Sequence, residues 1–118
     1  MSVFVYFETD NYDNHYQFSN LNFTAILGVA EGSDVSSELL RLLNEGALMH
    51  AVCIENYSID TQTEFISFMQ DFLKYVKTKT SDMSYLNHIE SFVKILTDRK
   101  QDLKTNFTYL DEGERFQL

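Results

Sequence analysis

Acidic and tyrosine side chains alternate near the start of the chain, and these residue types suit contact with a basic protein. Glu8, Asp10 and Asp13 flank a predicted turn, with Tyr12 and Tyr16 interleaved. Carboxylates orient a cationic partner by attraction, and tyrosine rings supply contact area that loses water on binding. We expect these residues to form a partner-binding surface. The alternative is a solvated loop that only keeps the chain soluble.

The negative charge is concentrated in the first 73 residues, which hold eleven carboxylates and one cation, Arg41. The remaining 45 residues hold seven acids and eight bases, so the net charge of −9 belongs to the first part of the chain. Such a field attracts basic partners and opposes direct binding to nucleic acid or to anionic membranes. Glu31 and Asp34 lie in this region beside a second predicted loop, and we include both among the expected partner contacts.

Residues with catalytic or metal-binding chemistry are few and badly spaced. Cys53, the only cysteine, follows His50 by three positions, and such positions in a strand face opposite sides. We therefore expect Cys53 to be a buried structural thiol. The segment 10–14 fails the EF-hand pattern because His15 stands where glycine is needed. Four glycines form no phosphate-binding loop. We assign no catalytic residue, no metal site and no cofactor.

Four segments predict strands, from either a continuous apolar run or period-two alternation. Residues 3–7 form an apolar run, so both faces are apolar, which indicates a buried strand. Residues 15–29 alternate and predict one long bent strand or two short ones, joined to the first by a hairpin. Residues 48–57, with an apolar centre, predict another buried strand, and residues 106–110 predict a short final one.

Three helices are predicted from apolar residues at helical spacing. The first follows possible N-caps at residues 32–34 and ends near Gly46, which suits a left-handed C-cap. The second begins with a capping box at residues 61–64, and the third begins at residues 80–82. Because their connection is short, we expect the last two helices to form an antiparallel pair.

These elements predict one α+β domain over residues 1–118, with the order β-β-α-β-α-α-β. Three helices would cover a small, mostly antiparallel sheet of three to five strands. The N-terminus lacks the positive charge and apolar length of a secretion signal. No segment approaches the roughly 20 apolar residues of a membrane helix. We therefore expect a cytoplasmic protein with no membrane association.

The function that best fits this acidity is inhibition of a basic toxin or nuclease, as by an immunity protein or antitoxin. Such a protein would cover the active or substrate-binding surface of its target. One alternative is a nucleic-acid mimic that blocks a DNA-binding protein, although the acids are scattered rather than spaced like phosphates. Another is a small acid–base enzyme, which would need a polar cleft. The identity and activity of the partner and the oligomeric state stay open.

Overall fold

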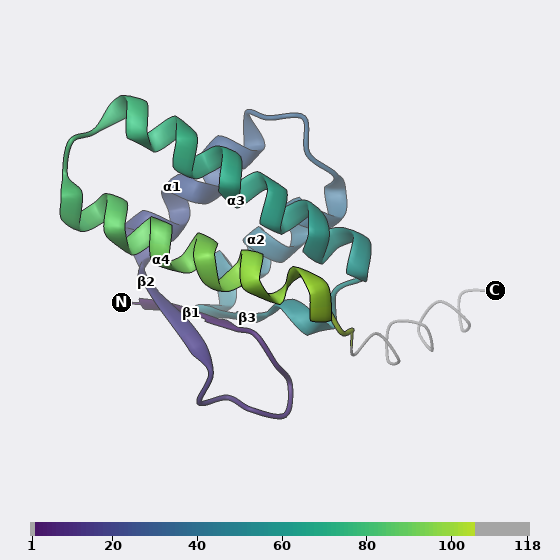
Figure 1. Ribbon diagram of the computed structural model, residues 1–118. Coiled ribbons are helices and arrows are strands. Elements are labelled where there is room, and N and C mark those ends of the chain that lie inside the picture. Colours follow the sequence, from purple (N-terminus) through teal and green to yellow (C-terminus); the bar gives the residue numbers. More distant parts are fainter. Residues whose placement is uncertain (1, 106–118) are drawn as a thin grey trace.

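Four helices cover one face of a three-stranded sheet in the computed structural model, which describes residues 2–105 (Figure 1). The elements in chain order are β1 (Ser2–Tyr6), β2 (His15–Ser19), α1 (Asn20–Glu31), α2 (Ser37–Met49), β3 (Ala51–Cys53), the 3₁₀ turn η1 (Ile54–Asn56), α3 (Ile59–Lys79), α4 (Met83–Arg99) and the 3₁₀ turn η2 (Lys100–Asp102). The fold is α+β in broad class. The predicted element order and the mostly antiparallel sheet are wrong.

The sheet is mixed, with β1 in the centre. Val5 of β1 lies opposite Tyr16 in the antiparallel β2 and opposite Val52 in the parallel β3. The predicted hairpin between the first two strands is confirmed. β3 runs parallel to β1 because α1 and α2 carry the chain across the covered face before it re-enters the sheet. Alternation in the sequence carries no information about this direction.

Helix α1 occupies residues for which the sequence predicted a continuing strand. The strand stops at Ser19, whose hydroxyl accepts a hydrogen bond from the amide of Asn22 (3.1 Å) and caps the helix. The apolar residues of this segment also fit helical spacing. Ile26 is buried on the helical stripe, whereas Leu21, part of the period-two pattern, is 81% exposed. Packing of that stripe into the core selects the helix over the strand.

Helix α2 is longer than predicted at its C-terminal end and starts later. Gly46 lies inside the helix and not at its C-cap. Glycine suits this position because a Cβ there would come within 2.7 Å of the Phe23 ring. His50 is the left-handed C-cap instead, with φ at 60°. Ser36, and no residue of 32–34, is the N-cap. Since α2 extends to Met49, the strand predicted over residues 48–57 shrinks to three residues.

The N-cap of helix α3 lies three residues before the predicted capping box. Ser58 is its N-cap, and the hydroxyl of Ser58 accepts a hydrogen bond from the amide of Thr61 (3.1 Å). Glu64, expected to close that box, instead accepts a hydrogen bond from the amide of Ser36 (2.8 Å) across to the start of α2. The tertiary contact therefore replaces the local one.

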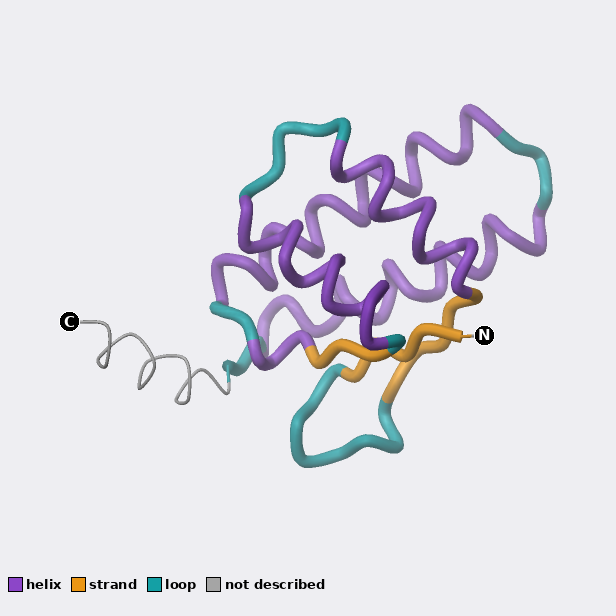
Figure 2. Tube along the Cα trace, turned by 180° about the vertical axis from the view of Figure 1, so that it is seen from behind, coloured by secondary structure: helices purple, strands orange, loops and turns teal. Residues whose placement is uncertain are grey.

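Helices α3 and α4 form the predicted antiparallel pair over the sheet (Figures 1 and 2). The last helix begins within the predicted residues 80–82, where Asp82 is the N-cap and accepts hydrogen bonds from the amides of Ser84 (3.1 Å) and Tyr85 (3.2 Å). Phe92 of α4 lies in the centre of the core, and its ring centroid is 4.8 Å from that of Phe18 in β2. The core therefore joins the helical pair to the covered face of the sheet.

The strand predicted over residues 106–110 lies outside the described residues. Within residues 2–105, no helix is both long enough and apolar enough to cross a membrane.

Candidate functional site

The face of the sheet opposite the helices carries a cluster of aromatic side chains. Alternation along β1 directs its valines into the core and Phe4 and Tyr6 to the open face, where both are half-buried. The His15 ring lies 5.4 Å from both of these rings, and the Tyr12 ring lies 5.1 Å from that of Tyr6. Tyr12 is 62% exposed. We call Phe4, Tyr6, Tyr12 and His15 the aromatic face.

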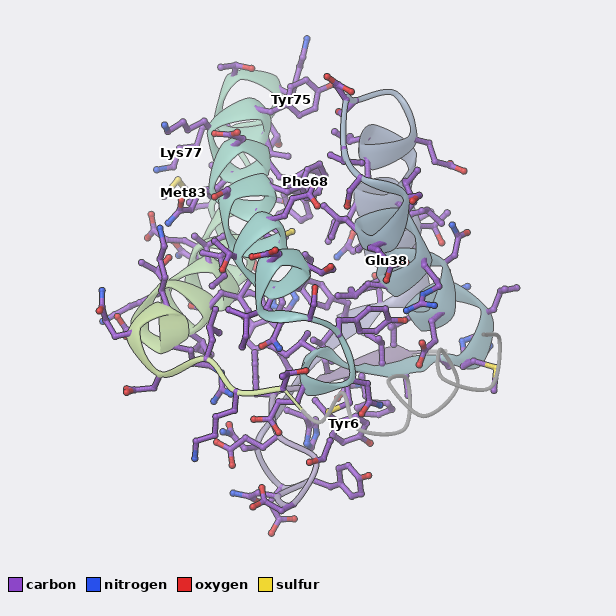
Figure 3. All side chains as sticks on the ribbon, turned by 90° about the vertical axis from the view of Figure 1, so that its right-hand side faces the viewer. Tyr6, Glu38, Phe68, Tyr75, Lys77 and Met83 are labelled. Carbon is purple, nitrogen blue, oxygen red and sulfur yellow. The ribbon has the colours of Figure 1, made fainter. Side chains whose placement is uncertain are left out.

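No described helix covers the aromatic face. Figure 1 shows the four helices on the other side of the sheet, and Figure 3 shows Tyr6 on the side away from them. In Figure 2 the sheet again lies at one edge of the molecule, with the helices on one side only. Among residues 2–105, the aromatic face is therefore accessible to a partner.

Residues 8–14 connect β1 to β2 and project beyond the sheet on the side away from the helices (Figure 1). We call this segment the acidic loop. Asp10 and Asp13 are exposed, and neither forms an ion pair within the described part of the chain. Glu8 lies at the base of the loop, and its Oε1 is 3.2 Å from Nη1 of Arg99. The loop thus presents two exposed carboxylates, without an ion pair among residues 2–105, next to the aromatic face.

A partly buried ionic cluster fixes the base of the acidic loop. Nη2 of Arg99 donates to the carbonyl of Phe7 (3.0 Å) and lies 3.8 Å from Oε2 of Glu55. Glu55 is only 6% exposed, and its Oε1 accepts hydrogen bonds from the amide (3.0 Å) and hydroxyl (3.3 Å) of Thr9. Because the buried carboxylate has both a cation and two donors, its charge is compensated. The cluster joins η1 and α4 to the residues that follow β1, at the base of the loop.

A cavity of about 480 Å³ lies between the acidic loop and the end of α4. Its ionisable lining residues are Glu8, Asp10, Glu55, Asp98, Asp102, Arg99 and Lys104. Five carboxylates against two cations give the lining a negative excess, which favours an organic cation such as a lysine or arginine side chain. Within residues 2–105, no three His, Cys, Asp or Glu side chains are placed to hold a metal ion.

The structure brings together four of the seven residues expected to contact a partner: Glu8, Asp10, Tyr12 and Asp13. They share the acidic loop, and Tyr12 links it to the aromatic face. Glu31 and Asp34 lie at the connection between α1 and α2, at the opposite end of the molecule (Figure 1). The expected residues therefore form two separate acidic regions.

Tyr16 lies on the covered face of the sheet, because it alternates with His15 along β2. Its hydroxyl donates to the carbonyl of His88 in α4 (2.6 Å), and its ring centroid is 5.0 Å from that of Phe92. Burial raises the pKa of Tyr16 and lowers the pKa of His88. The polar end of Tyr16 is therefore used within the protein.

Cys53 is buried, as predicted, on the same side of the sheet as Tyr6, with which it is in register. Burial is the main cause that raises the pKa of its thiol, which lowers its reactivity at neutral pH. His50 lies outside the strand as the C-cap of α2.

Several residues of this surface were missed in the sequence. Phe4 and Tyr6 were assigned to a strand buried on both faces, although their i, i+2 spacing also indicates an open face when only one side is covered. His15 joins them through strand pairing. No sequence signal connects Arg99 to Glu8, because 91 positions separate them.

Comparisons with known proteins identify no relative. No protein-family model matches the chain, and no curated protein or solved structure matches it significantly.

Proposed function

We propose that this protein is an inhibitor that binds a basic toxin or nuclease, as an immunity protein or antitoxin does, and covers its active or substrate-binding surface. The observation that carries this proposal is the continuity of the aromatic face with the acidic loop through the contact between Tyr6 and Tyr12, whose ring centroids are 5.1 Å apart. Aromatic area that would lose its water on binding and carboxylates that would orient a basic partner thus lie on one accessible surface.

The aromatic face supports binding because its rings are already held by one another. The Tyr6 ring contacts Phe4 (6.3 Å), His15 (5.4 Å) and Tyr12 (5.1 Å). Rings positioned in this way lose little side-chain entropy when a partner docks, and tyrosine is enriched among residues that dominate interface energy.

The acidic loop supports the choice of a basic target. Toxins that act on nucleic acid hold phosphate groups with lysine and arginine, and those cations remain exposed when no substrate is bound. Asp10 and Asp13 would attract that surface and accelerate association. The cavity beside the loop, of about 480 Å³, would accept one of the cationic side chains.

The same contacts favour binding over the alternative functions. Oε1 of Glu55 accepts from Thr9, and Glu8 is held by Arg99, so these carboxylates are engaged in maintaining the loop. An acid–base enzyme would instead aim such groups at a substrate position. A nucleic-acid mimic would carry its charges along one face, whereas these acids lie in two regions at opposite ends of the molecule.

The test is affinity capture from native lysate with three baits: the wild-type chain, Tyr12→Ala and Met83→Ala. Met83 is also an exposed large side chain, 63% exposed against 62% for Tyr12, but it lies at the start of α4 away from the aromatic face. We expect a basic toxin or nuclease to be retained by the wild type and by Met83→Ala. Loss of the Tyr12 ring should weaken binding by about 2 kcal/mol, roughly thirtyfold.

The captured protein must also be inhibited. Purified partner is assayed for cleavage of RNA and DNA, and for growth arrest when expressed alone, with and without one equivalent of the chain. A partner that keeps full activity in the complex contradicts inhibition. Equal retention by the Tyr12→Ala bait would show that binding occurs at another surface.

A further inference from the structure

We propose that a groove at the opposite end of the molecule binds a cationic amphipathic helix of another protein. The groove has a volume of about 580 Å³ and lies between α3 and the connection that joins α1 to α2. Its apolar lining includes Val29, Val35, Phe68, Phe72 and Tyr75. We call it the helix groove. Its volume is within the range of well-formed binding sites.

The wall on α3 consists of a buried floor and one accessible side chain. Phe68 and Phe72, at 9% and 3% exposure, belong to the hydrophobic core and form the floor of the groove. Tyr75, at 47% exposure, is the aromatic side chain of α3 that a partner can contact. Figure 3 shows Phe68 and Tyr75 on the side of α3 that faces α1 and α2. A docked helix would present its own apolar stripe, at i, i+3 or i+4 and i+7, to this wall.

The rim of the helix groove determines the charge of its occupant. Asp34, Glu64 and Asp71 line it, and none of its lining residues is lysine or arginine. Glu64 is engaged by the amide of Ser36. Asp34 and Asp71 are exposed and form no ion pair among residues 2–105. Both would therefore attract lysine or arginine side chains that flank an apolar stripe.

A cation already contacts the accessible side chain of this wall. Nζ of Lys79 lies 5.5 Å from the ring centroid of Tyr75, so the ammonium group lies over the plane of this tyrosine ring. A second copy of the chain is a poor occupant because each copy carries a net charge of −9 and the two would repel each other. Charge complementarity thus favours a basic helix from a different protein.

The helix groove and the proposed toxin-binding surface share no lining residue, so each can fail without the other. The probe is a fluorescently labelled synthetic peptide of leucine and lysine, with leucines at i, i+3, i+4 and i+7. One comparison peptide has glutamate in place of lysine. Another has the same composition as the probe in an order that destroys the apolar stripe. Binding is measured by fluorescence anisotropy with the full-length protein at low and physiological salt.

We expect the leucine–lysine peptide to bind more weakly as salt rises, and the glutamate peptide not to bind. The reordered peptide should bind at least about tenfold more weakly, because it keeps the charge but cannot fill the groove. Equal affinity for the probe and the reordered peptide would overturn the proposal, since it would indicate attraction to the general acidity of the chain.

Ser67 supplies a matched pair of variants because it is exposed on α3 and lines the groove. Ser67→Lys should weaken peptide binding by about tenfold through like-charge repulsion, and Ser67→Glu should strengthen it. Tyr75→Ala should also weaken it, whereas Tyr12→Ala should leave it unchanged. Circular dichroism checks that each variant is folded.

Two results would contradict this assignment. Unchanged peptide affinity in both Ser67→Lys and Tyr75→Ala would place the peptide elsewhere. Sedimentation that shows a wild-type dimer, converted to a monomer by either Ser67 substitution, would identify a second copy as the occupant and overturn the proposal of a basic helix.

Discussion

Arg99, the last residue of α4, holds Glu8 at the base of the acidic loop, with Nη1 and Oε1 3.2 Å apart across 91 positions of sequence. The same guanidinium donates to the carbonyl of Phe7 and lies 3.8 Å from Glu55. One side chain therefore connects α4 to η1 and to the residue that follows the central strand. We expect the position of the acidic loop and the stability of the fold to depend on this residue.

Arg99→Met is expected to destabilise the protein by about 2–4 kcal/mol, because Glu55 would remain buried without its cation. Arg99→Lys should lose less stability because it keeps the positive charge, although it cannot reproduce the planar guanidinium that contacts several acceptors. The measurement is the free energy of unfolding from urea titration. Lys100→Gln, at the exposed neighbouring position, should stay within about 0.5 kcal/mol of the wild type. A similar loss in both Met and Gln variants would contradict a specific role for Arg99.

Gly46→Ala and Gly28→Ala should change stability in opposite directions. A Cβ at Gly46 would lie 2.7 Å from the buried Phe23 ring, whereas a Cβ at Gly28 would meet nothing within 4 Å. Alanine favours a helix over glycine by about 1 kcal/mol, so Gly28→Ala should gain about 0.5–1 kcal/mol. At Gly46 overpacking exceeds this gain, and we expect a net loss of about 1–2 kcal/mol. Thermal and urea unfolding measure both, and a stabilised Gly46→Ala would show that the Phe23 ring moves aside easily.

His88 should make the protein less stable as pH falls below its ordinary pKa of 6.5. Burial lowers the pKa of this imidazole in the folded state, so the unfolded chain takes up a proton there first. Proton uptake by the unfolded state lowers the free energy of unfolding from about pH 6.5 down to the folded pKa. His88→Gln lacks this contribution and should lose less stability between pH 7.5 and pH 5.5. Urea titrations at several pH values measure the difference, and parallel curves for the two proteins would contradict it.

Neutralising the acidic loop should slow association with the proposed basic partner. Asp10→Asn combined with Asp13→Asn removes two exposed carboxylates, so the association rate should fall by about threefold to tenfold at low salt and depend less on salt. Stopped-flow mixing measures the rate, and the free energy of unfolding should hardly change. Glu31→Gln combined with Asp34→Asn removes the same charge at the other end of the molecule and is the matched control. An equal effect of the two pairs would mean that net charge alone controls the rate.

Local patterns gave a correct account of elements that are decided within a few residues. Turn residues, caps and apolar spacing correctly predict the β1–β2 hairpin, the start of α4 after residues 80–82 and the antiparallel pair of α3 and α4. Where two local patterns competed, the prediction failed. Residues 20–31 fit both a strand and a helix, and burial of the Ile26 stripe decided for the helix.

The surface was predictable only in part for the same reason. Acidic residues and Tyr12 stand next to one another in the chain, so their grouping in one loop followed from the sequence. Phe4 and Tyr6 became a surface only because no described helix covers that side of the sheet. The contact of Arg99 with Glu8 could not be predicted from any periodic pattern in the sequence.

The sequence by itself determined the acidity of the first 73 residues, the alternation in β1 and the burial of Cys53, because these depend on residue type and near neighbours. Only the tertiary structure decided that β3 runs parallel to β1, that Asp10 and Asp34 lie at opposite ends, and that α3 forms a wall of the helix groove. Those features depend on which distant segments bury one another's apolar surface, and that pairing is set by the free energy of the whole folded chain.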